Sequence, residues 1–377
     1  MRTLSNVNFS GLRVLLRVDY NVPLDSNGNI TDDFKIRKSL PTIKKILKKS
    51  KQLIIMSHLG RPEGKKVDRL KMDKVAIRLM KLLGRNVAKI DDCVNVILPE
   101  DKIVLLENLR FHKEEKENAK KFAKELASYA DFFVNDAFGV CHRAHASVVG
   151  VAEQLPSCAG LLVEEEVKNL DFSDPEKPFM VVLGGSKLST KFPVIKTLIP
   201  KVDKLLLGGA MIFTFYKAKG VSIGNSLFEK EQVTTANLLT HNNKLVLPED
   251  VVVASDISED AESRNVNYLQ IPHTWVGLDV GKESVKDFKK HLSKAKTVFW
   301  NGPLGYFEID RFAEATNEIA EFLAELDARV VIGGGDSAAF VQKLGMADKF
   351  SHVSTGGGAA LELIEKGSLP GLEVLKN

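Results

Sequence analysis

Arginine and histidine side chains gather in three short segments of the first half of the chain. A guanidinium carries several N–H donors in a planar fork, so it binds a phosphate or carboxylate through two hydrogen bonds at once. If the three arginines converge, they would hold a small, highly charged anion, and the histidines would add directed donors. Taken singly, each side chain is more often part of a surface ion pair or of the packed interior. The segments are Ser57-His58-Leu59-Gly60-Arg61, Asn108-Leu109-Arg110-Phe111-His112 and Cys141-His142-Arg143-Ala144-His145.

Glycine is concentrated in the second half of the chain. Residues 176–377 contain 19 of the 27 glycines, many of them where apolar runs end. Glycine-rich turns allow phosphate groups to approach backbone N–H donors closely, so they suit a nucleotide. A chain with both kinds of segment is typical of a phosphotransferase with two substrates. The clusters are Gly184-Gly185-Ser186-Lys187, Gly208-Gly209, Gly333-Gly334-Gly335-Asp336 and Gly356-Gly357-Gly358.

Two of these clusters carry charged side chains that suit a polyphosphate and its metal. If a helix begins near Ser186, Lys187 and Lys191 lie four residues apart on one face, beside a helix N-terminus that favours anions. Asp336 could hold Mg²⁺, which prefers carboxylate and phosphate oxygens. The structural alternatives are two solvated lysines and an aspartate that caps a helix. The cluster at 356–358 repeats the strand–glycine–helix pattern and predicts a second set of exposed N–H donors.

The elements that would position these groups alternate along the chain. Short runs of apolar residues predict strands, and helical patterns lie between them. Several runs are almost entirely apolar, as in strands covered on both faces, so the predicted fold class is α/β with doubly wound parallel sheets. Such sheets bind ligands beyond the carboxyl ends of their strands, where the polar groups lie. The strands are predicted at 13–19, 52–57, 102–107, 131–136, 179–184, 204–208, 297–301, 329–333 and 352–355, and the clearest helices at 68–83, 116–129 and 313–326.

Length and composition limit the class of protein. At 377 residues the chain exceeds the roughly 250–300 residues that one core accommodates, so we expect two domains. A net charge of +4 with scattered lysines gives no indication of nucleic-acid binding. Three cysteines without a CxxC pair are typical of a cytoplasmic protein that has no disulfides. The sequence has no apolar run of about 18 residues and no sustained heptad pattern, so we expect no membrane partner and, by default, a monomer.

The motifs together resemble one family, phosphoglycerate kinase, over essentially the whole chain. Neither the P-loop pattern nor the Gly-x-Gly-x-x-Gly dinucleotide pattern occurs in the sequence. The motifs that carry the resemblance follow one another in family order. They are Arg17-Val18-Asp19-Tyr20-Asn21-Val22-Pro23, Ser57-His58-Leu59-Gly60-Arg61-Pro62, Glu107-Asn108-Leu109-Arg110-Phe111, Asp136-Ala137-Phe138-Gly139, His142-Arg143-Ala144-His145, Gly184-Gly185-Ser186-Lys187 with Lys191, Trp300-Asn301-Gly302-Pro303-Leu304-Gly305-Tyr306-Phe307-Glu308, 333–337 and 354–358.

The resemblance implies two doubly wound, Rossmann-like domains joined by a hinge helix. The amino-terminal domain, residues 1–160 with a returning tail at about 366–377, would bind 3-phosphoglycerate or 1,3-bisphosphoglycerate. The linker helix would occupy 161–175, and the carboxy-terminal domain, 176–365, would bind MgADP or MgATP. The implied activity is reversible transfer of the acyl phosphoryl group of 1,3-bisphosphoglycerate to MgADP, a step of glycolysis and gluconeogenesis. Hinge closure would bring the two substrates together.

The resemblance also implies roles for individual residues. The triose would be bound by Asp19, Asn21, Lys35, His58, Leu59, Gly60, Arg61, Arg110, His142 and Arg143. The nucleotide would be bound by Lys187, Lys191, Gly277, Asn301, Glu308, Gly334, Gly335, Asp336 and Ser337, with Glu308 on the ribose and Asp336 as the ligand of Mg²⁺. The catalytic groups would be Lys191, Lys35, Gly357 and Gly358. No nucleophilic side chain is required, because positioning and neutralisation of charge carry such a transfer.

One residue departs from the family pattern. The family has a catalytic arginine where this chain has Lys35. Lysine keeps the charge but loses the planar fork, so the exchange is not conservative, and we expect an active enzyme with a weakened or re-routed contact. Arg37 would face elsewhere in a regular helix and could replace the arginine only if the segment is irregular. Smaller departures are Ser337, where threonine is common, and Lys282, where proline is usual and which lies near the expected adenine pocket.

Two other hypotheses compete with this one. A non-catalytic phospholigand-binding or scaffold protein of the same fold would be favoured if several transfer groups were lost together. Lys191, Asp336 and the glycines at 356–358 are all present, which argues against that hypothesis. A different two-domain acyl-phosphate kinase is disfavoured by the basic segments, and a test with acetate as acceptor would distinguish it. Nucleotide preference, direction of flux and secondary roles are not determined by the sequence.

Overall fold

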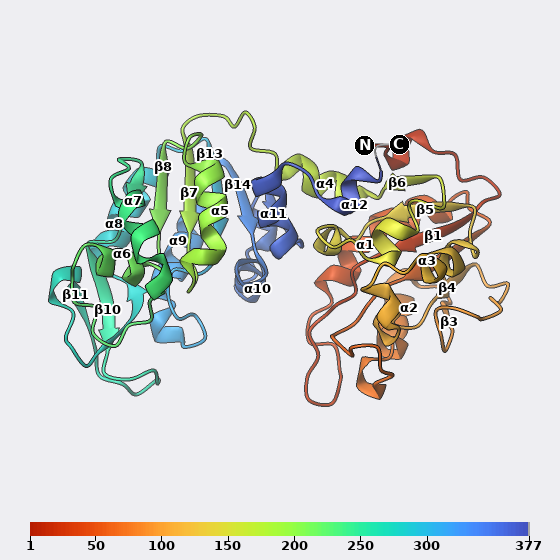
Figure 1. The fold of residues 1–377 in the computed structure, drawn as a ribbon, viewed down its shortest axis with the longest axis horizontal. Helices are drawn as coiled ribbons and strands as arrows, with labels where there is room; N and C mark the ends of the chain where they lie inside the picture. Colours follow the sequence, from red (N-terminus) through yellow and green to blue (C-terminus); the bar gives the residue numbers. More distant parts are fainter. Residues whose placement is uncertain (376–377) are drawn as a thin grey trace. The chain divides into compact units, whose positions relative to one another are not determined.

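The computed structural model describes residues 1–375, which form two compact units (Figure 1). The first unit comprises Met1–Lys168 and the described residues from Lys366 onward, and the second comprises Asn169–Glu365. Residues 376–377 of the expected tail lie outside the described part of the chain. Among the helices of residues 1–375, none has the length and apolar composition needed to cross a membrane.

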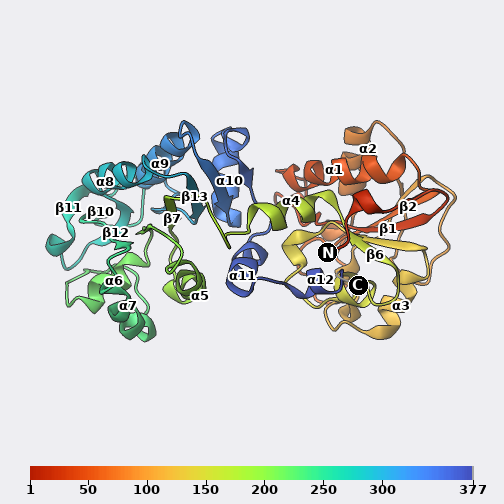
Figure 2. The same cartoon turned by 90° about the horizontal axis from the view of Figure 1, so that it is seen from above.

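The first unit is built on a six-stranded sheet with helices on both faces. Its strands are β1 (Arg13–Arg17), β2 (Gln52–Met56), β3 (Ala88–Lys89), β4 (Ile103–Leu105), β5 (Phe132–Asn135) and β6 (Ser157–Ala159), and its main helices are α1 (Phe34–Leu47), α2 (Asp73–Leu83) and α3 (Lys120–Ala127). The strand order is β3-β4-β2-β1-β5-β6, and all neighbours are parallel. Figure 2 shows α1 and α2 over one face of the sheet and α3 over the other.

Two separate cores explain why the strands of this unit are apolar on both faces. Successive residues of a strand point to opposite sides of the sheet. Val14 belongs to the same buried cluster as Ile43 of α1 and Val75 of α2, whereas Leu15 belongs to a second cluster with Phe122 of α3. Burying one such side chain contributes roughly 1.5–3 kcal/mol, so covering both faces stabilises the sheet from both sides. The doubly wound architecture expected from the sequence is confirmed.

The helix that follows the first sheet is α4 (Leu161–Asn169). Its first turn is held by Asp136 after β5, whose Oδ1 accepts hydrogen bonds from the backbone N–H groups of Leu162 (2.9 Å) and Val163 (3.4 Å). Helix N-termini leave such donors unsatisfied, so a carboxylate here is stabilising. Burial raises the pKa of Asp136 to about 7. The helix ends at Asn169, which is shorter than the span of 161–175 expected for the linker.

The last described residues pack against the first unit. The short helix α12 (Pro370–Glu373) is held where Gly371 N donates to the carbonyl of Cys141 over 2.8 Å. Arg2 N donates to the carbonyl of Leu375 over 3.0 Å, which joins the two ends of the described chain. Hydrogen bonds to buried backbone groups therefore fix this segment.

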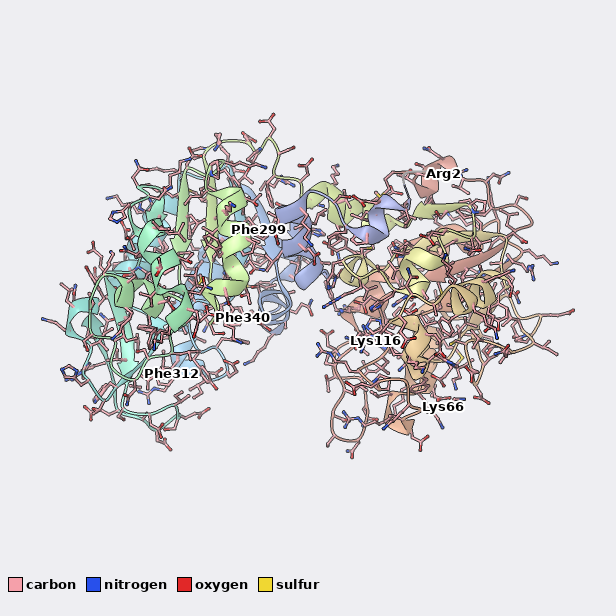
Figure 3. All side chains as sticks on the ribbon, viewed as in Figure 1. Arg2, Lys66, Lys116, Phe299, Phe312 and Phe340 are labelled. Carbon is pink, nitrogen blue, oxygen red and sulfur yellow. The ribbon has the colours of Figure 1, made fainter. Side chains whose placement is uncertain are left out.

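The second unit repeats the architecture and adds a small sheet. Its main strands are β7 (Phe179–Leu183), β8 (Lys204–Leu207), β9 (Leu245–Val246), β13 (Thr297–Asn301), β14 (Arg329–Gly333) and β15 (His352–Val353), and its helices are α5 (Leu188–Leu198), α6 (Ile212–Ala218), α7 (Val233–Thr240), α8 (Lys282–Leu292), α9 (Glu314–Ala324), α10 (Gly335–Lys343) and α11 (Gly358–Lys366). The parallel order is β15-β14-β13-β7-β8-β9. Figure 2 shows α8, α9 and α10 on one side and α5, α6 and α7 on the other. Phe299 and Phe340, labelled in Figure 3, are buried in this unit.

The small sheet was not expected from the sequence. It pairs β10 (Asp250–Ala254) with β11 (Ser263–Asn267) and β12 (Val276–Val280), both antiparallel. Strand β11 is mostly polar and mostly exposed, so it gives no apolar run for pattern analysis to detect. Strand β12, the other partner of β10, matters for the site, because it carries Gly277 and Asp279.

Two predicted helices begin later than the sequence pattern indicates. The pattern at 68–83 is divided into a 3₁₀ turn, Asp68–Leu70, and α2. The pattern at 116–129 gives α3 only from Lys120 onward. Ahead of α3, Glu115 is fully buried and its carboxylate accepts hydrogen bonds from Ser147, which holds this segment in a separate turn. Tertiary hydrogen bonds therefore override the local helical periodicity here.

Candidate active site

A buried amide aligns the two basic loops that follow β2 and β4. Asn108 donates through Nδ2 to the carbonyls of Leu59 (2.7 Å) and Leu70 (2.9 Å). Its Oδ1 accepts from the N–H groups of Leu59 and Arg110, both at 3.1 Å. All of the amide's hydrogen-bonding groups are thus directed at these loops, so the relative position of His58 and Arg110 is fixed by one side chain.

Gly60 is the point at which three predicted site residues meet. Its carbonyl accepts from Arg110 Nη1 over 2.8 Å, and its N–H donates to Asn21 Oδ1, also over 2.8 Å. Gly60 has φ of 65°, and an added Cβ would lie 2.8 Å from the side chain of Leu70. The left-handed backbone favours glycine at this position, and an added Cβ would displace the end of the Leu70 side chain. The structure thus brings together Asn21, Gly60 and Arg110.

The cations of these loops lie close enough to influence one another. Burial lowers the pKa of Arg110 to about 10, with further lowering by the neighbouring guanidiniums of Arg17 and Arg61. Burial also lowers the pKa of His145 to about 4, and nearby Arg143 and His142 act in the same direction. Arg61 and Arg143 are exposed, whereas His142 is half-buried. Clustered cations of this kind suit an anion that carries several charges.

Lys35 occupies the first turn of α1 and pairs with Asp19. Its Nζ lies 2.7 Å from Asp19 Oδ2. Burial alone would raise the pKa of Asp19, but the ammonium of Lys35 and the guanidinium of Arg17 outweigh it and hold that pKa well below its usual value. Helix α1 is regular from Phe34, so Arg37 lies on another face.

Arg37 is engaged in contacts of its own. Its Nε donates to Asp33 Oδ1 over 2.8 Å, and Arg78 Nε donates to the other oxygen of the same carboxylate over 2.6 Å. The side chain of Arg37 is 56% exposed. The proposal that Arg37 replaces the family arginine needed an irregular segment, and the regular helix does not provide it.

In the second unit, the glycine clusters at 333–336 and 356–358 border a small cavity of about 170 Å³. Helix α10 begins after Gly334, which has φ of 93°, and α11 begins after Gly357, which has φ of 52°. Both helix starts direct backbone N–H groups toward the site. The cavity is lined by Lys191, Asn301, Gly302, Gly334, Gly335, Asp336, Ser337, Gly357, Gly358 and Leu361.

Lys191 is a half-buried cation that lines this cavity. Its Nζ donates to Asn301 Oδ1. Desolvation by burial lowers the pKa of Lys191 to about 8, against the opposing effect of Asp336. Two other residues that line the cavity are joined by a hydrogen bond, because Gly302 N donates to Ser337 Oγ over 2.7 Å. An ammonium held next to two helix N-termini and one carboxylate forms a site for phosphate oxygens together with a divalent cation.

The structure contradicts two sequence expectations, the shared helix face of Lys187 and Lys191 and the alternative in which Asp336 caps a helix. Helix α5 begins at Leu188, and Lys187 precedes it with an extended backbone, so Lys187 and Lys191 do not share a helix face. The N-terminus of α5 is already occupied by Glu229, whose Oε2 accepts from Ser189 N over 2.9 Å. The N-cap of α10 is Gly334, and Asp336 lies inside the first turn with an exposed side chain. Asp336 is therefore free of a capping role.

A larger hollow of about 300 Å³ shares Asp336 with the small cavity. Gly277 lies in its wall, and a Cβ added there would overlap the ring of Phe213. An apolar wall of this shape suits a planar base. Glu308, exposed at the rim, lines the same hollow. The nucleotide residues predicted from the sequence, except Lys187, are therefore distributed over two adjoining hollows of one unit.

Two residues of this hollow were missed by sequence reasoning. Phe213 of α6 lines the hollow against Gly277. Asp279 of β12 is buried, accepts hydrogen bonds from Val280 N (2.8 Å) and Ala315 N (3.0 Å), and has a pKa that burial raises to about 8. The signal available in the sequence was an aspartate inside an otherwise apolar run, which indicates a buried carboxyl with specific partners.

Comparisons with known proteins agree with this geometry. The family model for phosphoglycerate kinase matches residues 4–367. The chain is 49% identical to the phosphoglycerate kinase of Acaryochloris marina, over 99% of this chain and 97% of that protein. It is 50% identical to that of Nostoc sp., over 99% and 98%.

A solved structure supports the same assignment at the level of the fold. The phosphoglycerate kinase from Coxiella burnetii superposes with a TM-score of 0.88 at 41% identity, covering 99% of this chain and 98% of that one. Agreement in sequence and fold over nearly the full length of both chains leaves a single assignment. The chain belongs to the phosphoglycerate kinase family.

Proposed function

We propose that this chain transfers the acyl phosphoryl group of 1,3-bisphosphoglycerate to MgADP, and the reverse, with the triose on the first unit and the nucleotide on the second. The assignment of the two sites rests on the difference between the chemical groups that the two units offer. The first unit offers a cluster of guanidinium and imidazole groups held by Asn108. The second offers two hollows with Lys191, Asp336 and two helix N-termini. Each set suits one of the two anions.

Different residues of the second unit bind the base, the ribose and the phosphates of the nucleotide. The base lies in the larger hollow beside Gly277, with Glu308 near the ribose. The phosphates lie in the smaller cavity with Lys191, Asn301 and the N–H groups at the start of α10. Asp336 would hold Mg²⁺, because one exposed carboxylate beside phosphate oxygens matches the ligands that this ion prefers. The bound ion would supply positive charge next to the phosphate oxygens.

The transfer needs no covalent intermediate with the protein. The carboxyl oxygen of the triose leaves as the β-phosphate oxygen of ADP attacks the phosphorus in line. Lys191 and the N–H groups at Gly357 and Gly358 stabilise the charge on the equatorial oxygens from one side. Lys35 supplies the cation of the triose side. Because the substrates are assigned to different units, transfer takes place in an arrangement that brings the two sites together, and α4 is the proposed hinge.

The activity is tested by 3-phosphoglycerate-dependent consumption of MgATP by the purified protein. The 1,3-bisphosphoglycerate formed is reduced in a coupled reaction with NADH, and loss of NADH absorbance is recorded. Acetate in place of 3-phosphoglycerate is the control for another acyl-phosphate kinase, and we expect no turnover with it. Binding of both ligands by calorimetry without turnover would contradict the proposal and favour a non-catalytic member of the fold.

The expected location in the cytoplasm is part of the same proposal. All three cysteines are free thiols in the structure, and all three are buried. Free thiols are typical of reducing compartments, which supports this location.

A further inference from the structure

Arg17, the last residue of β1, is a fully buried cation behind the triose loops. In the parallel register of β1 and β2 it pairs with Met56, two residues before His58. Its guanidinium makes three polar contacts. Nε donates to Ser147 Oγ over 2.8 Å, Nη1 donates to the carbonyl of Val18, and Nη2 lies 3.2 Å from His58 Nδ1. A planar fork held at three points has little freedom to rotate.

The contact with Arg17 determines the tautomer of His58. A guanidinium has only donors, so His58 Nδ1 must accept this hydrogen bond and the ring proton must lie on Nε2. The nearest carboxylate oxygen to Nδ1, Asp19 Oδ1, is 3.9 Å away, which is too far for a hydrogen bond that would favour the other tautomer. Within residues 1–375, His58 Nε2 has no hydrogen-bond partner in the protein. The donor is therefore available to a ligand.

The surroundings of His58 also favour its neutral form. Desolvation by burial lowers the pKa of His58 well below its usual value. Asp19 opposes this effect, whereas Arg17, Arg110 and Lys35 reinforce it. A protonated ring would place a donor against a donor and a cation against Arg17.

A buried carboxylate keeps the charge of Arg17 balanced. Glu115 is fully buried, and its Oε1 lies 4.0 Å from Arg17 Nη2. Ser147 joins the two, because its Oγ accepts from Arg17 Nε and donates to Glu115 Oε1 over 2.6 Å. The hydrogen bonds thus run in one direction from guanidinium to hydroxyl to carboxylate. A network in which every member is satisfied holds its parts rigidly.

We propose that Arg17 is a positioning residue that holds His58 as the neutral Nε2–H tautomer, so that His58 serves the triose anion as a fixed hydrogen-bond donor and not as an acid. The inference rests on the proposed function. It explains why a cation that is wholly removed from solvent lies next to a loop that binds an anion. The guanidinium acts through the imidazole, whose Nε2–H adds direction to the charge that Arg110 supplies.

The tautomer is tested directly by NMR of the full-length protein labelled with ¹⁵N-histidine. The signals of His58 are assigned by their loss in His58→Gln. We expect His58 to carry its proton on Nε2 from about pH 5 to about pH 8, without titrating. A proton on Nδ1, or titration within that range, would overturn the proposal. This experiment uses the ligand-free protein, so it is decided independently of whether the protein turns over 3-phosphoglycerate.

The effect on function is tested with Arg17→Lys. An ammonium keeps the charge but has no planar fork to reach Ser147, Val18 and His58 together. We expect His58 to show a mixture of tautomers and KM for 3-phosphoglycerate to rise by about tenfold, with KM for MgATP unchanged. The matched control is Arg13→Lys, at the other end of β1, where the arginine is partly exposed and pairs with Asp131. An Arg17→Lys protein with the parent tautomer and the parent KM would contradict the proposal.

Discussion

At the scale of single residues, Lys35 is the departure with the largest consequence. Its ammonium lies 2.7 Å from Asp19 Oδ2 in a partly buried pair. We expect Lys35→Ala to lower kcat/KM for 3-phosphoglycerate by about a hundredfold, because it removes a cation and leaves the Asp19 carboxylate without its partner. Lys35→Arg keeps the charge, and we expect at least the parent rate.

The matched control for this series is Arg37→Ala. Arg37 pairs with Asp33, and Arg78 binds the same carboxylate, so the loss of one partner is expected to leave the rate unchanged. Initial rates in the coupled assay measure the effect of the Lys35 substitutions and of Arg37→Ala. If Lys35→Ala turned over as fast as the parent, Lys35 would not supply the transfer cation of the triose side.

The charge state of Lys191 predicts a pH profile. Desolvation by burial lowers its pKa to about 8. The ammonium is the form that attracts phosphate, so it is present below that pKa and is lost as the pH rises through it. We expect kcat/KM for MgADP to fall above about pH 8, and kcat to hold to higher pH because a bound anion favours the charged form. Lys191→Arg should remove the alkaline fall, and a fall that persists in this variant would assign it to another group.

At the scale of elements, a substitution in the turn between β14 and α10 tests whether the site has room for a side chain larger than glycine. Gly334 has φ of 93°, and an added Cβ would lie 2.5 Å from Asn301 Nδ2. Asn301 in turn binds Lys191. We expect Gly334→Ala to raise KM for MgATP by about tenfold and to lower the free energy of unfolding by about 1–3 kcal/mol.

A control substitution at a second glycine distinguishes the effect of backbone strain from the effect of a steric clash. Gly345, just after α10, has φ of 67° and nothing within 4 Å of an added Cβ. Gly345→Ala should therefore lower the free energy of unfolding by about 1 kcal/mol and leave KM unchanged. Chemical denaturation and initial rates measure the two quantities. Equal KM values in both variants would show that Asn301 tolerates the added methyl group.

At the scale of the whole molecule, the proposed reaction depends on how the two units are brought together. The triose and the nucleotide are assigned to separate units, so the reacting atoms meet only in an arrangement that joins the two sites. We expect small-angle scattering to show a smaller radius of gyration when 3-phosphoglycerate and a non-hydrolysable MgATP analogue are both bound. Either ligand alone is the control. An unchanged radius with both ligands would contradict hinge closure.

The sequence by itself determined the fold class and nine of the strands of the two main sheets, but not the short strands β3, β6 and β9. Runs such as 329–333 are buried on both faces, so their composition alone predicts parallel strands between helix layers. The basic segments and glycine clusters follow such strands, and a parallel sheet brings its carboxyl ends to one edge. The small sheet was not predicted because β11 is polar and gives no apolar run. The start of α5 was misplaced because the spacing of two lysines does not reveal where a helix begins.

Only the tertiary structure decided how the site residues are held. The pairing of Lys35 with Asp19, the convergence on Gly60 and the tautomer of His58 depend on side chains that are far apart in the sequence. Hydrogen-bond direction and desolvation act over a few ångströms, so they are set by which atoms folding brings into contact. Residue types specify the chemistry that is available, and the packing of the chain specifies which proton and which charge are present.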